Sequence, residues 1–224
     1  MIKFLLILML SVIIPSVYGQ TLTNGVYVQN GKTIEVDKHI HSFLPMKNSE
    51  ILYFSNELIV KLNTNSDFNV NSFYQEILNF TNYNKIKFGT HSLSATLSEG
   101  SAYVSFSSFD SNSVCAISTS LADLILGNGT FYISVKEEKV IVIVLDGSLK
   151  SEASKKHITV TSGYALIITP NDVGILEDKV SLRAEKVNSV ALTKLNSEMK
   201  DVIDLKGSVL FVNIEGKITG ININ

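Results

Sequence analysis

The stretch that decides the fold runs from Ile117 to Leu149 and reads ISTSLADLILGNGTFYISVKEEKVIVIVLDGSL. It predicts three consecutive β-strands with their turns, because β-branched and aromatic residues alternate with the glycine, asparagine and charged residues that are typical of turns. The run from Val140 to Leu145 is apolar at every position, so it must lie between two packed layers. This stretch therefore predicts a layered β-protein.

The same pattern extends along most of the chain. Short apolar runs alternate with turn residues about every eight to twelve positions, which is typical of a sandwich, a barrel or a β-helix-like stack. We expect a turn at Glu99-Gly100 and a hairpin about Ser162-Gly163. Between residues 72 and 85, Phe73, Ile77 and Phe80 recur at helical spacing and predict one or two helical turns. The predicted fold class is mainly β, an antiparallel sandwich or β-helix-like stack of short strands.

The C-terminal part differs in pattern. Leu182 to Lys200 contains neither glycine nor proline, and its apolar residues form one stripe, which predicts an amphipathic helix. The stripe consists of Val187, Ala191, Leu195 and Met199. A closing β-hairpin follows, with strands at Val209 to Ile214 and Lys217 to Ile221. We expect the helix to pack on the sheet or on another copy of itself.

The N-terminus has the pattern of a secretory signal. Lys3 supplies a positive charge, an apolar stretch runs from Phe4 to Ile14, and small residues precede a predicted cleavage after Gly19. The apolar stretch is roughly half of the ~20 residues that a membrane-spanning helix needs. We therefore expect three parts, namely a signal peptide (1–19), a β domain (20–178), and a C-terminal helix with its hairpin (179–224). The expected location is the periplasm, the cell envelope or the extracellular space.

Composition excludes several classes of protein. Hydrophobic residues make up 45% and charged residues 18% of the chain, as in a folded globular protein. One cysteine allows no internal disulfide. The net charge of −2 gives no reason to expect nucleic acid or an anionic membrane as a partner, since both require a clustered positive surface.

The order of features from Glu50 to Ile168 resembles the FecR-type extracytoplasmic domain. A threonine-ended strand at Thr119 precedes Gly129-Thr130-Phe131, which is similar to the core signature of that family, and the strand pair around Gly147 and the last hairpin at Gly163 follow. Two positions depart from the family pattern. Ser120 stands where proline is common after the threonine, and Leu126 to Asn128 lack the arginine that often precedes the glycine.

The resemblance implies a structural role for the motif residues. Glycine at position 129 permits a close backbone approach, the Thr130 hydroxyl can close a turn, and Phe131 fills the core. Regulatory members of the family carry a cytoplasmic anti-sigma segment and a membrane span before this domain, whereas this chain looks like a free-standing exported version. The sigma-regulating role is therefore not carried over.

Candidates for chemistry are few. His39 and His41 lie two apart on a predicted strand and could grip one ion, but no third ligand is identifiable nearby. Cys115 lies in an apolar strand, where a cysteine is usually an inert small hydrophobe. No nucleophile elbow or phosphate-cradling glycine loop occurs. We expect no catalytic residues, no metal and no cofactor.

The sequence thus predicts an exported, non-enzymatic interaction module of the envelope or surface. Its partner would be another protein or, through the C-terminal tail, a second copy. The alternative is a carbohydrate-binding or carbohydrate-processing β-stack protein. Exposed aromatic platforms, for which Tyr27, Tyr53, Tyr74 and Tyr83 are the candidates, would favour that alternative.

Overall fold

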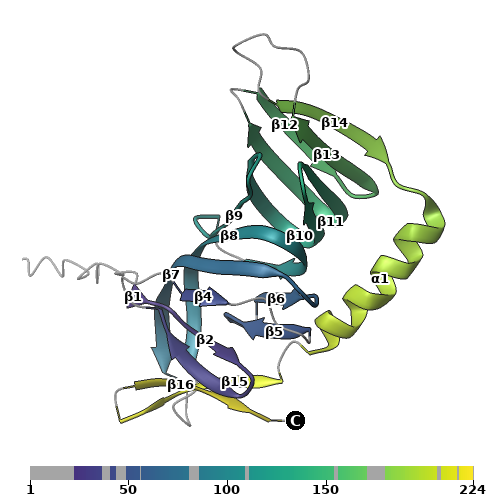
Figure 1. Ribbon diagram of the computed structural model, residues 1–224. Helices are drawn as coiled ribbons and strands as arrows, with labels where there is room; N and C mark the ends of the chain where they lie inside the picture. The colour runs from purple at the N-terminus through teal and green to yellow at the C-terminus, as the bar shows by residue number, and fades with distance from the viewer. Residues whose placement is uncertain are drawn as a thin grey trace, which may run out of the picture.

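The computed structural model describes residues 23–36, 41–43, 49–55, 57–80, 86–108, 111–153, 156–170, 180–205, 208–215 and 217–223. It confirms the predicted fold class: the described chain is mainly β, with a C-terminal helix and a closing two-stranded hairpin (Figure 1). His39 and Tyr83, which the sequence singles out, lie outside the described residues, as does the predicted signal peptide.

The elements follow one another in the order shown in Figure 1. The strands of the N-terminal half are β1 (Thr23–Asn24), β2 (Val26–Gln29), β3 (Lys32–Glu35), β4 (His41–Phe43), β5 (Glu50–Tyr53), β6 (Leu58–Leu62), β7 (Asp67–Phe80) and β8 (Ile86–Phe106). The remaining elements are β9 (Val114–Ser118), β10 (Asp123–Lys136), β11 (Lys139–Ala153), β12 (Lys156–Thr161), β13 (Tyr164–Pro170), β14 (Val180–Lys186), helix α1 (Ser189–Asp204), β15 (Val209–Ile214) and β16 (Lys217–Asn222).

One large coiled sheet holds most of these strands. Its main path runs β14-β13-β11-β10-β9-β8-β6-β5-β2-β3, while β7 pairs with β8 and carries β1 and β4, and β12 pairs with β11. The pairs are antiparallel except for β8 with β9, which run parallel over Ser92 to Thr96. The sheet is therefore mixed rather than purely antiparallel. Strands β15 and β16 form a separate hairpin.

Long strands that bend and change partners give the sheet its curvature. The first half of β8 pairs with β7 and β9, and its second half, beyond Gly100, pairs with β6 and β10. In turn β10 pairs with β9 before Gly129 and with β8 after it. Strands β8, β9 and β10 consequently close a circuit, and the apolar faces of their two halves point toward one interior.

The bend of β10 and β11 depends on two glycines that lie directly opposite each other, Gly129 and Gly147. Both have positive φ angles, +152° and +85°, and the register of the pair shifts on either side of Gly129. A Cβ on Gly129 would lie 2.1 Å from the Asp146 carbonyl oxygen, and one on Gly147 would lie 1.9 Å from that of Asn128. The two backbones can cross this closely only where neither residue has a side chain.

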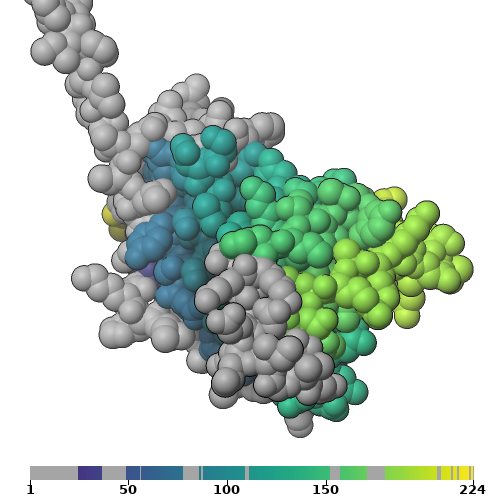
Figure 2. Space-filling model, turned by 90° about the horizontal axis from the view of Figure 1, so that it is seen from above, coloured from purple at the N-terminus to yellow at the C-terminus, as the bar shows by residue number. Residues whose placement is uncertain are grey.

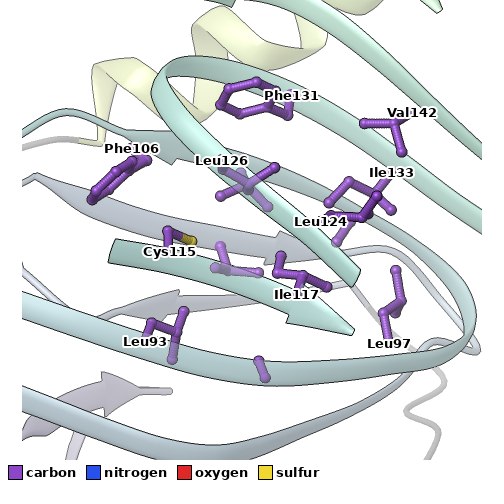
Figure 3. Packing of buried hydrophobic residues seen from close by; sticks show 14 of the residues in the cluster. Leu93, Leu97, Phe106, Cys115, Ile117, Leu124, Leu126, Phe131, Ile133 and Val142 are labelled. Carbon is purple, nitrogen blue, oxygen red and sulfur yellow. The ribbon is translucent and has the colours of Figure 1, made fainter. Parts of the chain in front are cut away.

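The core fills the space inside the bent strands, as Figure 3 shows. Leu93 and Leu97 from β8 and Ile117 from β9 face Leu126 and Phe131, which come from the two halves of β10. All five residues are almost completely buried. Val140, Val142 and Val144 join the same cluster, while Ile143 and Leu145 face helix α1 on the other side of the sheet. This confirms that the run from Val140 to Leu145 lies between two packed layers.

Two local predictions between residues 72 and 106 are wrong. Residues 72–80 belong to strand β7, whose register with β8 shifts between Gln75 and Ile77 and again between Ile77 and Asn79. The separation of four residues from Phe73 to Ile77 also fits the two-residue alternation of a strand. The second shift adds one residue to β7, which breaks the alternation and makes the separation of three residues from Ile77 to Phe80 resemble that of a helix. The predicted turn at Glu99-Gly100 is instead a bend within the continuous strand β8, where Gly100 has a φ of +93°.

The predicted hairpin about Ser162-Gly163 is also wrong. Strands β12 and β13 do not pair with each other but lie one after the other along the two halves of β11. The Ser162 hydroxyl donates to the Leu145 carbonyl and the Gly163 N–H donates to that of Val144, at 2.9 Å each. These residues therefore form a bend that follows the bend of β11 at Gly147.

The C-terminal helix begins later than the sequence predicts. Residues 180–186 form β14, which pairs with β13, and the helix covers Ser189–Asp204 instead of 182–200. Helix formation starts at Asn188, whose side-chain oxygen accepts a hydrogen bond from the Val190 N–H at 2.8 Å. Ladder hydrogen bonds to β13 satisfy the backbone of the preceding segment, so helical periodicity alone could not locate the boundary.

We expect Gly147→Ala to destabilise the protein more than Gly163→Ala. The two glycines have nearly equal φ angles, +85° and +83°, but a Cβ meets the Asn128 backbone at position 147 and nothing within 4 Å at position 163. Gly163→Ala should cost about 1–2 kcal/mol for its left-handed conformation, and Gly147→Ala about 3 kcal/mol or more, since backbone must also move. Urea unfolding of both variants measures the difference. Equal losses would contradict the close approach.

Candidate interaction surface

We call residues 180–223 the C-terminal segment. It contains strand β14, helix α1 and the β15–β16 hairpin, which pack against different parts of the molecule. Strand β14 extends the large sheet, α1 crosses the outer face of that sheet, and the β15–β16 hairpin reaches the N-terminal strands at the opposite end (Figure 1). In the space-filling view of Figure 2, the yellow-green residues of this segment stand out on one side of the molecule. Much of its surface packs against the rest of the chain.

Helix α1 uses its apolar stripe within the chain. Leu192, Leu195, Met199 and Val202 pack against outward-facing residues of the sheet, and Met199 and Val202 are 1% exposed. The sheet contributes Ile51, Tyr53, Ile59, Tyr103, Tyr132, Ile143 and Leu145. Of the predicted stripe, Leu195 and Met199 face inward, whereas Ala191 is exposed and Val187 precedes the helix. The sheet thus covers the stripe from Leu192 to Val202, whereas Val190 and Ile203 of the same helix are exposed.

A hydrogen bond at the centre of this interface fixes the helix on the sheet. The Tyr103 hydroxyl donates to a carboxylate oxygen of Glu198 on α1. Burial raises the pKa of Tyr103 well above its usual value, and the hydrogen bond from its hydroxyl to Glu198 raises it further. The Tyr103 ring lies 4.9 Å from that of Tyr132, and the Lys61 ammonium is 5.7 Å from its centroid. Tyr103 therefore combines packing with a charge-assisted hydrogen bond.

The β15–β16 hairpin closes on the N-terminal strands. The Gly220 N–H donates to the Thr33 hydroxyl oxygen at 2.9 Å, and this hydroxyl lies 3.4 Å from the Gly220 carbonyl oxygen. A Cβ on Gly220 would meet a methyl group of Val28 at 2.1 Å. Phe211 packs edge-on against Phe88 of β8 with 5.2 Å between ring centroids. The hairpin thus joins residues 187 positions apart, and its inner face is occupied.

Strand β14 lies at the end of the large sheet, and its described pairing is with β13 alone. The Val187 N–H donates to the Gly163 carbonyl at 3.0 Å. In an antiparallel pair every second residue bonds to the same neighbour, so the odd-numbered residues of β14 direct their backbone groups toward β13. The N–H and C=O groups of Leu182, Ala184 and Lys186 consequently point to the open edge.

The side chains along this edge are exposed and charged. Residues 183 to 186 are all exposed, and the Arg183 guanidinium lies 2.8 Å from the Glu185 carboxylate. Both charged groups lie on the outer face of the strand, because residues two apart share a face. Leu182 on the inner face packs against the core. Within the described part of the chain, the edge therefore presents a row of backbone groups without a strand partner, beside the cations Arg183 and Lys186 and the anion Glu185.

The structure disperses the motif residues that the sequence singled out. Phe131 is fully buried, Gly129 and Gly147 form the close approach described above, and Gly163 lies at the bend between β12 and β13. Thr130 lies within β10. The hydroxyl that closes a turn belongs to Thr119, which accepts from the Ala122 N–H at 3.1 Å and donates to the Ala122 carbonyl at 2.9 Å. These residues shape the sheet rather than a common site.

The tyrosines considered for sugar binding are placed differently from one another. Tyr27 is 1% exposed and lies among core residues, with its ring 5.1 Å from that of Phe54. Tyr53 is half-buried and packs under α1, while Tyr74 is 40% exposed on β7. An open cleft of about 250 Å³ lies elsewhere, and no aromatic ring is among its lining residues, which are Thr64, Asn65, Glu99, Gly100, Ser101, Ser134, Val135 and Lys136.

Potential metal ligands do not gather in the described part of the chain. Within it, no group of three or more His, Cys, Asp or Glu side chains could hold an ion. Cys115 is fully buried between β8 and β10, and burial raises the pKa of its thiol to about 12, which keeps it protonated. Among the residues described, no helix has the length and the apolar content needed to cross a membrane.

Comparison with known proteins adds little to these observations. No protein-family model and no curated protein matches the chain. It is similar to two crystal structures described as putative anti-sigma factors from Parabacteroides distasonis. The first is 11% identical with a TM-score of 0.47 over 83% of this chain and 100% of the other. The second is 10% identical with a TM-score of 0.37 over 88% and 99%. Likeness at this level assigns neither family nor function.

Sequence reasoning did not identify β14 as a strand or its edge as a surface. Arg183 and Glu185 were included in a predicted helix, where residues two apart do not face each other. The available signal was the alternation of Val180, Leu182 and Ala184 with Ser181, Arg183 and Glu185, which is the two-residue period of a strand. The Tyr103–Glu198 hydrogen bond joins positions 95 apart, and no local pattern indicates such a contact.

We expect Tyr103→Phe to loosen α1 without unfolding the sheet. Removing the hydroxyl eliminates the hydrogen bond to Glu198, which we estimate at about 1 kcal/mol because this carboxylate is partly exposed. Amides of α1 should then exchange faster in hydrogen-exchange mass spectrometry, while those of β8 and β10 keep their rates. Glu198→Gln is the matched control, since its amide oxygen still accepts from Tyr103. An unchanged exchange rate of α1 in Tyr103→Phe would exclude this role.

Proposed function

We propose that this chain is an exported, non-catalytic interaction module that acts at the cell envelope or outside the cell and associates with copies of itself. The open edge of β14 is the observation that supports the proposal best. A sheet edge with unpaired N–H and C=O groups is a template for pairing with another strand, which folded proteins normally cover or interrupt. Among the described strands, β13 alone pairs with β14 and leaves this edge open, while the apolar stripe of α1 and the inner face of the hairpin pack within the chain.

The distribution of side chains favours interaction over catalysis. The motif residues with known positions serve the bends and the core of the sheet, and the buried thiol of Cys115 is protonated. Exposed polar and charged groups lie instead along β14 and α1, among them Arg183 and Glu185. Peptide recognition by strand addition needs only such backbone groups, with side-chain pairs providing the selectivity.

The N-terminal sequence supports export. A single positive charge, an apolar stretch of about half the spanning length, and small residues before Gln20 are the three features that signal peptidase substrates share. Cleavage after Gly19 would release residues 20–224. A location in the envelope or outside the cell follows from this proposal.

Expression of the full chain with its own N-terminus in a bacterial host tests both parts. We expect the exported protein to have the intact mass of residues 20–224, and light scattering after size exclusion to give twice that mass at high micromolar concentration. Retention of residues 1–19 would contradict cleavage. A mass of one chain over the whole concentration range would contradict self-association.

A further inference from the structure

We infer that two copies of this chain pair through β14 about a twofold axis at Ala184, in an antiparallel arrangement that joins their large sheets. The inference rests on the proposed function, in that it names the partner and the contact for self-association. It goes further by fixing one register. In that register Arg183 of one copy faces Glu185 of the other, and the twofold axis repeats the contact.

The backbone of β14 supports this register. Since Val187 donates to Gly163 on the β13 side, Ala184 directs its N–H and C=O outward. Two antiparallel strands centred on Ala184 can therefore exchange both hydrogen bonds between these residues. The backbone groups of Leu182 and Lys186 also point outward. In this register, Leu182 of one copy would exchange hydrogen bonds with Lys186 of the other. The pairing thus gives hydrogen-bond partners to the outward-pointing N–H and C=O groups of Leu182, Ala184 and Lys186.

The charge pattern of β14 is self-complementary in the same register. Residue 183 of one copy lies opposite residue 185 of the other, and these two residues exchange no backbone hydrogen bonds. At such pairs the opposing Cα atoms are about 4.5 Å apart and the side chains approach closely. Arg183 and Glu185 are 66% and 46% exposed, so each can reach a second partner. A shift by two residues would place like charges or uncharged residues opposite each other. The antiparallel twofold arrangement therefore has a preferred register.

The remaining side chains fit the same pairing. Ala184 meets its own counterpart at the axis, where a methyl group leaves room for close approach of the strands. Leu182 lies opposite Lys186, whose hydrocarbon stem can cover the part of Leu182 that the core leaves exposed. Helix α1 packs on β8 and β11, which lie inside the sheet and not at its edge. Because the side chains of β14 complement those of a second β14, they favour a second copy over a partner of different sequence.

The test uses charge reversal on the mature full-length chain. Arg183→Glu places two negative charges opposite each other, and Glu185→Arg places two positive charges opposite each other. We expect each variant to weaken dimerisation by about tenfold or more, because two attractive cross-strand pairs become repulsive. Sedimentation velocity over a range of concentrations measures the dissociation constants. Lys217→Glu, an exposed reversal on the hairpin, is the control and should leave the dimer unchanged.

An equimolar mixture of the two variants is the decisive sample. In a mixed dimer every contact at positions 183 and 185 is again between opposite charges, so dimerisation should return to the wild-type level. The double variant R183E/E185R should also dimerise. Both single variants lack the Arg183–Glu185 ion pair within the strand, and mixing cannot restore it. Recovery in the mixture therefore reports a contact between chains.

Three results would overturn the inference. They differ in whether they also contradict the proposed self-association. If wild-type protein stays monomeric, self-association itself is wrong. If both single variants dimerise as tightly as wild type, the protein associates through another surface, and only this register is wrong. If the variants are monomeric and folded by circular dichroism but their mixture stays monomeric, the charges act within one chain and not across a twofold axis.

Discussion

The backbones of β10 and β11 cross closely at Gly129 and Gly147, and this crossing determines how the large sheet bends. Because neither residue has a Cβ, β10 and β11 can bend together at one point, and each strand then serves different neighbours on the two sides of the bend. Strand β9 reaches both β8 and β10 for this reason. Without the bend, a sheet of this length would expose the apolar face that now encloses the core.

The bend also determines which strand forms the end of the large sheet. Strands β12 and β13 follow the two halves of β11, and β14 is the next strand beyond β13. From there the chain returns across the outer face as α1, which is fixed by the Tyr103–Glu198 hydrogen bond, and ends in a hairpin held by Thr33 and Gly220. The apolar stripe of α1 and the inner face of the hairpin pack within the molecule, and the described strands leave the polar edge of β14 without a second partner.

Local periodicity in the sequence was sufficient for the fold class and for the buried run from Val140 to Leu145. It was insufficient where a bulge changes the alternation of β7, as between Ile77 and Asn79, because apolar residues then recur at a helix-like spacing. It also failed at Gly100, Ser162 and Gly163, where turn residues bend a strand or redirect the chain without reversing it. Pairing partners of long bent strands depend on contacts distant in sequence, and the β14 edge becomes visible only once that pairing is known.

Pairing of two copies through β14 should change the exchange rate of the Ala184 amide. Residue-resolved hydrogen exchange can be compared at a low concentration, where the protein is monomeric, and at a high one. Arg183 and Glu185 bond to β13, so their amides should be protected at both concentrations. If β14 pairs with a second copy, the Ala184 amide should exchange rapidly at low concentration and become protected at high concentration. Equal rates for Ala184 at both concentrations would contradict this pairing.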